Sequence, residues 1–335
     1  MNNSKDNNIE NKKINNNTTN IDTEKSSSSI FSKTVFVWIG ALISCLLWGS
    51  AFPMIKLGYK EFDISSDEMA AQILFAGIRF VLAGILAVLL GCIFQKKLLF
   101  PKKGSIPLIL KLSCFQTVGQ YFFFYVGLAH TSGVRASIVQ GTNVFIALIV
   151  ACLIFKQETL STKKIIGCII GFAGVVLVNL TGNSLGGGSI LLGDCFIILS
   201  TVAYAFSSVL LKEYTKKEDP VILSGYQFIA GGLIMIIAGL VMGGRIQQVT
   251  TKGIVDLIYL AFVSAAAYTL WGLLIKHNPV SKVAVFGFMT PVFGVITSLL
   301  LLDESSGFSL IHLVSLILVC IGIYIVNSSK EKTTS

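Results

Sequence analysis

Charged residues are scarce in this chain: Asp, Glu, Lys and Arg make up 13% of its 335 residues, against roughly 25% in ordinary soluble proteins. Histidine is also rare, and His130, His277 and His312 form no pair at metal-ligand spacing. The low charge excludes an ordinary soluble enzyme, a disordered protein and a nucleic-acid binder, although the net charge is +9. We expect neither a metal nor any other cofactor.

Cysteine motifs are missing as well. The seven cysteines all lie inside apolar stretches, and none belongs to a CxxC pair. The pattern therefore indicates neither disulfides nor a zinc site, and the cysteines are predicted to be small buried hydrophobic side chains.

Long apolar runs are abundant. The hydrophobic fraction is 53% and the mean hydropathy is +0.78. Ten runs have about 20 residues each, the length at which a helix crosses about 30 Å of hydrocarbon. The predicted spans are residues 35–57, 71–94, 106–129, 134–155, 163–180, 191–211, 221–243, 253–275, 280–302 and 309–328. We predict an all-α integral membrane protein with ten transmembrane helices, preceded by a disordered Asn/Ser-rich tail over residues 1–34.

Lysine is distributed unevenly between the predicted connections. If the tail is inside, every inner connection carries lysine, whereas the outer connection at residues 181–189 has no charge at all. Lys and Arg accumulate in cytoplasmic loops. Both termini are therefore predicted to be cytoplasmic, in a chain that spans the cytoplasmic membrane.

An offset of 147 or 148 residues recurs along the chain, which predicts two repeats of five spans, residues 35–180 and 190–328. Because five is odd, the second repeat crosses the membrane upside down relative to the first. Such inverted repeats are common in secondary transporters, where the site lies between the repeats. The matched pairs include Phe80–Phe228, Gly84–Gly232 and Tyr121–Tyr268.

The first span combines Trp48 with small residues and Pro53. Proline removes a backbone donor and kinks a helix. One interpretation is a bent helix whose Trp48 lines a cavity; the alternative is simple helix packing at Gly49 and Ala51. Tyr204 occupies the equivalent depth of the sixth span, which favours the cavity.

Arg79 lies inside the second span, where an unpaired charge costs several kcal/mol. It is either an electrostatic anchor for a carboxylate or another anionic group, or a structural arginine that snorkels outward or binds exposed carbonyls. Its counterpart in the second repeat, Gln227, is neutral.

Polar residues and a proline meet at one predicted depth of the fourth and ninth spans, where Asn143 corresponds to Pro291. They are candidate walls of a midplane site; an interhelical hydrogen bond and a plain kink are the alternatives. In the third span, Gln116 and Gln120 are four residues apart and therefore share one face, which we expect to point inward.

These features together resemble the EamA type of the drug/metabolite transporter superfamily. The resemblance covers residues 35–328 and rests on the Trp48–Pro53 segment, the Arg79–Phe80 pair, the Thr290–Phe293 segment followed by Glu304, and glycines in the fifth and tenth spans. It implies export, sometimes import, of small metabolites such as amino acids and nucleobases by alternating access. Asn143 departs from the pattern, because the family usually carries a proline there, and is thus a candidate for specificity.

We therefore expect a secondary transporter rather than an enzyme, moving amino acids or related anionic or zwitterionic solutes. A multidrug or cation efflux transporter, and a membrane-embedded enzyme or sensor, are the alternatives. The predicted substrate-binding residues are Trp48, Arg79, Gln120, Asn143, Tyr204, Tyr268 and Pro291, with Pro53 and Pro291 bending their helices.

The sequence leaves alternatives for the coupling ion and for the oligomeric state. No Asp or Glu falls at mid-depth, and Asp194 lies just inside the outer end of the sixth span, so facilitated diffusion or exchange is as compatible as proton antiport. Gly167 and Gly171 form a GxxxG face, which predicts helix packing or a dimer contact. The expected partners are a small-molecule substrate and the lipid bilayer, for a monomer or homodimer.

Overall fold

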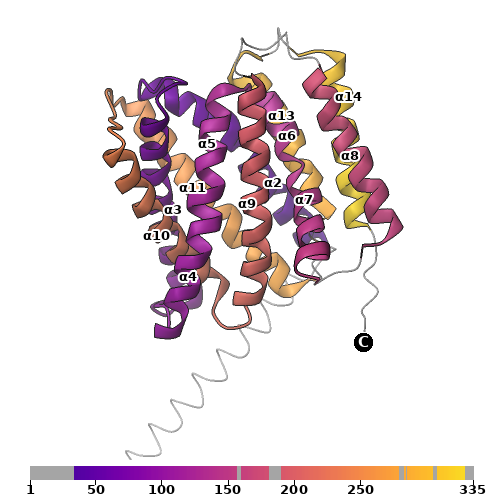
Figure 1. The fold of residues 1–335 in the computed structure, drawn as a ribbon. Coiled ribbons are helices and arrows are strands. Elements are labelled where there is room, and N and C mark those ends of the chain that lie inside the picture. The colour runs from indigo at the N-terminus through magenta and orange to yellow at the C-terminus, as the bar shows by residue number, and fades with distance from the viewer. Residues whose placement is uncertain are drawn as a thin grey trace, which may run out of the picture.

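The computed structural model describes residues 34–156, 160–180, 190–278, 283, 285–304 and 308–328. These residues form a bundle of helices, and no strand occurs among them (Figure 1). The predicted tail, apart from Thr34, and the crossover at 181–189 lie outside the described residues.

The region of the first predicted repeat contains five helical segments, two of which are made of several consecutive elements. They are α2 (Thr34–Glu61); α3 (Met69–Gln95); α4 (Ile106–Ser113), which follows the 3-10 turn η1 (Lys103–Ser105) and continues through the π-helix η2 (Cys114–Gly119) into α5 (Gln120–His130); α6 (Gly133–Gln140), α7 (Asn143–Ile149) and the π-helix η3 (Val150–Ile154); and α8 (Thr162–Leu180).

The second region contains α9 (Ile190–Tyr214), α10 (Pro220–Val241), α11 (Thr251–His277), the 3-10 turn η4 (Val285–Phe288), α13 (Met289–Leu301) and α14 (Leu310–Asn327). Among the described residues, seven helical segments are long and apolar enough to cross a membrane, and the segment Phe286–Leu301 is shorter. The predicted all-helical fold with several membrane-length apolar helices is confirmed for the described residues, whereas ten spans in two inverted repeats stay a prediction.

Local sequence explains where several helices begin. The Asp219 side chain accepts a hydrogen bond from the Val221 N–H (2.8 Å), and Pro220 occupies the first position of α10. Thr250 caps α11 in the same way through the N–H of Gly253 (2.8 Å). Short polar side chains satisfy amide groups that lack an intrahelical partner, and proline has no amide to leave unpaired.

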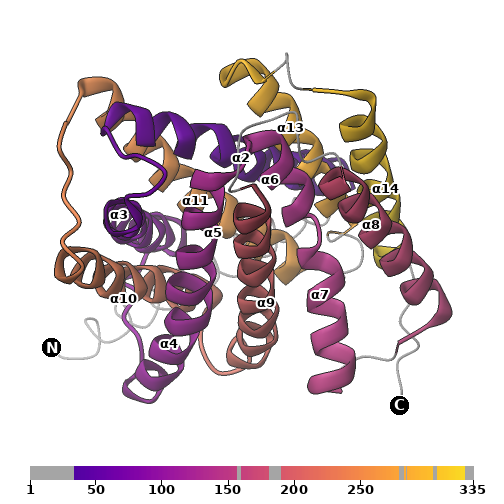
Figure 2. The same cartoon turned by 45° about the horizontal axis from the view of Figure 1, so that its top comes forward.

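Glycines bring α3 and α10 into backbone contact at one side of the bundle (Figures 1 and 2). A Cβ at Gly84 would lie 2.5 Å from the carbonyl oxygen of Gly225, and one at Gly77 would lie 2.8 Å from that of Gly232. Atoms cannot approach that closely without a backbone shift, so glycine is required where these helices cross.

The pair α8 and α14 packs in the same manner at the opposite edge (Figure 2). A Cβ at Gly167 would lie 2.8 Å from the Gly322 carbonyl oxygen, and Gly171 leaves room for the Phe145 ring. The GxxxG face therefore serves packing inside the chain.

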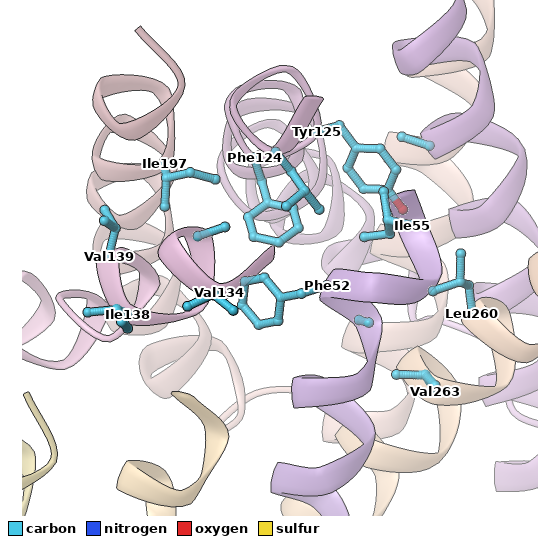
Figure 3. Close-up of a cluster of buried hydrophobic side chains, with 14 of the residues drawn as sticks. Phe52, Ile55, Phe124, Tyr125, Val134, Ile138, Val139, Ile197, Leu260 and Val263 are labelled. Carbon is cyan, nitrogen blue, oxygen red and sulfur yellow. The ribbon is translucent and has the colours of Figure 1, made fainter. Parts of the chain in front are cut away.

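The core between the two regions is built from aromatic and branched side chains. Phe52 of α2 points toward Phe124 of α5 and Val134 of α6 (Figure 3), and the Phe52 and Phe124 ring centroids are 5.5 Å apart. Ile197 of α9 completes this layer from the second region (Figure 3).

Helices are interrupted at the depth predicted for Asn143 and Pro291. A turn at Gly141 and Thr142 separates α6 from α7, and Asn143 is the first residue of α7. In the second region, the 3-10 turn η4 gives way to α13 two residues before Pro291. Regular α-helix is thus interrupted in both segments at this depth, beside an asparagine in the first and beside a proline in the second.

Candidate functional site

Aromatic side chains from four helices meet in the interior of the bundle. Trp48 of α2 lies 5.5 Å from Tyr268 and 5.2 Å from Trp271 of α11, measured between ring centroids. Tyr268 in turn contacts Phe228 of α10 edge-on (5.2 Å), and Phe228 stacks on Phe80 of α3 (5.3 Å). We call these five residues the aromatic cluster. Trp48 and Tyr268 are only half-buried, so part of each side chain is accessible at the cluster.

Tyr121, next to Gln120 on α5, extends the cluster. Its hydroxyl lies 3.2 Å from the hydroxyl of Tyr268, and its ring lies 4.1 Å from that of Phe80. The hydroxyl pair joins two residues that are 147 positions apart in the chain.

Arg79 is buried, with 3% of its surface exposed, behind Phe80. Its Nε donates to the Leu260 carbonyl oxygen (3.2 Å), its Nη2 to the Ser264 hydroxyl (3.0 Å) and its Nη1 to the Tyr125 hydroxyl. The guanidinium thereby joins α3, α5 and α11. This arrangement agrees with the interpretation of Arg79 as a structural residue, and its action on a substrate stays a prediction.

The remaining predicted site residues lie on α5, α7, α9 and α13, which pack against α2 or against one another. Gln120 is 5% exposed, and its Oε1 has no hydrogen-bond partner among the described residues. Tyr204 is half-buried and lies close enough to Tyr268 to interact electrostatically. Asn143 is half-buried, whereas Pro291 is buried. The structure thus brings Trp48 into direct contact with Tyr268 and places Tyr204 near Tyr268.

A buried ion pair lies at one end of the bundle. Arg135 of α6 forms an ion pair with Asp194 of α9 (2.5 Å), and the two side chains are 2% and 1% exposed. Asp194 also accepts from the Thr131 hydroxyl (3.0 Å), while Arg135 donates to the Val178 carbonyl oxygen (2.8 Å). Sequence reasoning missed this pair, because 59 positions separate its members and no local pattern connects them.

Two further residues tie the same end together. The Glu304 carboxylate accepts from the N–H groups of Gly133 (2.9 Å) and Val134 (3.0 Å), the first amides of α6. An anion at a helix N-terminus is stabilised by the helix dipole and the free amides. Lys56 of α2 donates to the Thr131 carbonyl oxygen (2.6 Å). We call Arg135, Asp194, Glu304 and Lys56 the polar closure.

Asp256 on α11 was also missed. It is 5% exposed, and its Oδ2 has no hydrogen-bond partner among the described residues. Its only signal in the sequence is an acidic residue three positions inside the predicted span 253–275.

An apolar groove of about 620 Å³ lies elsewhere, between α7 and α8, with Ile149, Ile169 and Phe172 among its lining residues. None of the predicted site residues lines it. Within the described part of the chain, no group of three or more His, Cys, Asp or Glu residues is arranged to hold a metal ion.

The sequence profile of the EamA-like transporter family matches residues 35–180 and again residues 191–328. The chain belongs to the EamA-like transporter family. The resemblance inferred from the Trp48–Pro53 segment, Arg79 and Glu304 is therefore confirmed.

Relatives with transporter names support this assignment. An uncharacterized transporter of Archaeoglobus fulgidus is 30% identical over 79% of this chain and 89% of its own length. A probable amino-acid metabolite efflux pump of Escherichia coli is 26% identical over 85% of this chain and 92% of its own length. One solved crystal structure shares the fold, with a TM-score of 0.62 at 15% identity, over 86% of this chain and 95% of the other. The chain is a multi-pass membrane transporter by family, and the two relatives described above carry transporter or efflux-pump names.

Proposed function

We propose that this chain exports small organic metabolites, amino acids or related anionic and zwitterionic solutes, across the cytoplasmic membrane by alternating access. The observation that carries the proposal is the contact between residues that the sequence offset of 147 or 148 predicts to be equivalent in the two repeats. The name of the Escherichia coli relative, a probable amino-acid metabolite efflux pump, supports the substrate class.

The equivalent contacts support ten spans in two inverted repeats. Phe80 stacks on Phe228, 148 positions away, and the Tyr121 hydroxyl meets that of Tyr268, 147 positions away. Residues related by a two-fold axis can touch each other only beside that axis. Both pairs belong to or adjoin the aromatic cluster, so the cluster lies on the axis between the repeats, where secondary transporters bind substrate. The uneven lysine distribution supports cytoplasmic termini.

The proposed substrate site is the aromatic cluster with Gln120, Asn143, Tyr204 and Pro291 around it. Trp48 and Tyr268 provide apolar surface, and the Gln120 Oε1, which lacks a partner among the described residues, provides an acceptor. Arg79 adjoins the cluster, because its guanidinium carbon lies over the Phe80 ring, 5.1 Å from the ring centroid. Its positive charge favours an anionic or zwitterionic substrate.

The polar closure supports alternating access. Arg135 and the amides of Gly133 and Val134 belong to the first family repeat, whereas Asp194 and Glu304 belong to the second. These contacts therefore hold the repeats together at the end predicted to be outside, and they must separate before the site opens to that side.

A cation exporter is a second candidate, because the faces of Trp48, Trp271 and Tyr268 suit a cationic ligand. Arg79 opposes it, since a like charge near the cluster repels a cation.

The test compares metabolites inside and outside cells that express the intact chain, Tyr268→Ala or the control Lys216→Gln, at equal membrane abundance. Lys216 is exposed and pairs with Glu213, so this control should behave like the intact chain. Export of carboxylate-bearing compounds that is lost in Tyr268→Ala supports the proposal. Loss of cations alone favours the second candidate, and no change in any metabolite contradicts both.

A further inference from the structure

The described spans contain two buried carboxylates with opposite surroundings. Asp194 has Arg135 and Thr131 as partners. Asp256, in the second turn of α11, has an Oδ2 with no hydrogen-bond partner in the described part of the chain, and only 5% of the residue is exposed.

The charged groups around Asp256 do not pair with it. Lys252, one turn earlier on α11, forms an ion pair with Glu61 of α2 (3.1 Å). On α3, Arg79 donates to Leu260 and Ser264, one and two turns further along α11. The third helix packed on α11 is α10, whose residues Pro220–Val241 include no Asp, Glu, Lys, Arg or His. Lys252 and Arg79 thus form their ion pair and hydrogen bonds with other groups, and the charges of Lys252 and Glu61 act on Asp256 through space with opposite signs.

A carboxylate with a buried oxygen that lacks a hydrogen-bond donor is unfavourable in its charged form, whereas binding a proton removes the charge. We propose that Asp256 is a reversible proton-binding site and that the proton is the coupling ion of this transporter. The proposal rests on the transport function proposed above.

One face of α11 connects this site with the aromatic cluster. Asp256, Leu260, Ser264 and Tyr268 follow one another at intervals of four residues, so they lie along the same side of the helix. Leu260 and Ser264 bind Arg79, and Tyr268 contacts Trp48. Because a helix moves as a rigid element, proton binding at Asp256 and substrate binding at Tyr268 act on the same moving part.

Reaction with dicyclohexylcarbodiimide tests proton binding without a known substrate. The reagent takes a protonated carboxyl group in an apolar environment: the carboxyl oxygen bonds to the central carbon of the carbodiimide, and the carboxyl proton moves to a carbodiimide nitrogen. The full-length protein in membranes is treated at acidic and at alkaline pH, and the modified peptides are quantified by mass spectrometry. Asp194 is the matched control in the same molecule, because it is as buried as Asp256 but forms an ion pair with Arg135.

We expect modification of Asp256 to be at least about tenfold greater at acidic pH, as for a group that changes protonation between the two conditions, with little modification of Asp194. The label should disappear in Asp256→Asn. No label on Asp256, or equal labelling at both pH values, overturns the proposal.

A second measurement separates this proposal from the transport function. Vesicles containing the intact chain or Asp256→Asn are loaded with the metabolites identified in the export experiment, and an inward pH gradient is imposed. Loss of gradient-driven efflux with retained exchange in Asp256→Asn supports the assignment. Gradient-driven transport that persists in the variant overturns it, whereas absence of flux in the intact chain contradicts the transport function and leaves the labelling result to decide proton binding.

Discussion

We predict that replacing Asp194 with Asn opens the end of the bundle at which the polar closure lies. The variant removes the Asp194 carboxylate charge from the buried Arg135 guanidinium, which also donates to the neutral Val178 carbonyl oxygen. Removing one partner of a buried ion pair typically costs about 3–5 kcal/mol. If that loss falls on the closed state alone, about 3 kcal/mol shifts the equilibrium toward the open state roughly 150-fold.

A cysteine at Ser137 reports this opening. Ser137 is 1% exposed and lies on α6 against Gly294 of α13, so a membrane-impermeant maleimide added outside cells should reach Ser137→Cys only in the open state. We expect labelling to rise steeply in the Asp194→Asn background, above the level set by the native cysteines. Glu213→Gln, which removes a solvent-exposed pair with Lys216, is the matched control and should change nothing. Unchanged labelling in a well-folded Asp194→Asn variant would refute the assignment of the ion pair as a latch.

Three other outcomes are expected. Gly84→Ala should destabilise the bundle by about 1–3 kcal/mol, since the added methyl lies 2.5 Å from the Gly225 carbonyl oxygen; a melting temperature in detergent no lower than that of the intact chain would contradict this. Trp48→Ala should reduce export by about tenfold or more while membrane abundance stays constant, because it removes the ring that contacts both Tyr268 and Trp271; full export would exclude Trp48 from the site. Burial raises the pKa of Glu218, but hydrogen bonds from the Ser105 hydroxyl and the N–H groups of Asp219 and Lys102 outweigh it and lower the pKa below its usual range. Its stabilisation is therefore present at neutral pH and is lost as the pH falls through the lowered pKa, so thermal stability should fall more steeply on acidification in the intact chain than in Glu218→Gln.

The candidate site could be predicted in part. Trp48 and Tyr268 were singled out by their depth and by the repeat, and the structure places them in direct contact. The ring stack of Phe80 on Phe228 was implied by the same offset but not foreseen as a contact. Arg79 was recognised as a residue that needs partners, yet those partners lie 46, 181 and 185 positions away, beyond the reach of any local pattern.

What the sequence determined by itself is the set of apolar segments, because a bilayer demands helices of sufficient apolar length whatever their partners are. The repeat and the family follow from the same local information. Only the tertiary structure decided which partners each buried charged side chain has, since helix packing sets the distance between groups far apart in the chain. Asp194 and Asp256 look alike in sequence, each an acidic residue near the edge of an apolar run. Helix packing places the Arg135 guanidinium against Asp194, whereas the Oδ2 of Asp256 has no hydrogen-bond donor among the described residues.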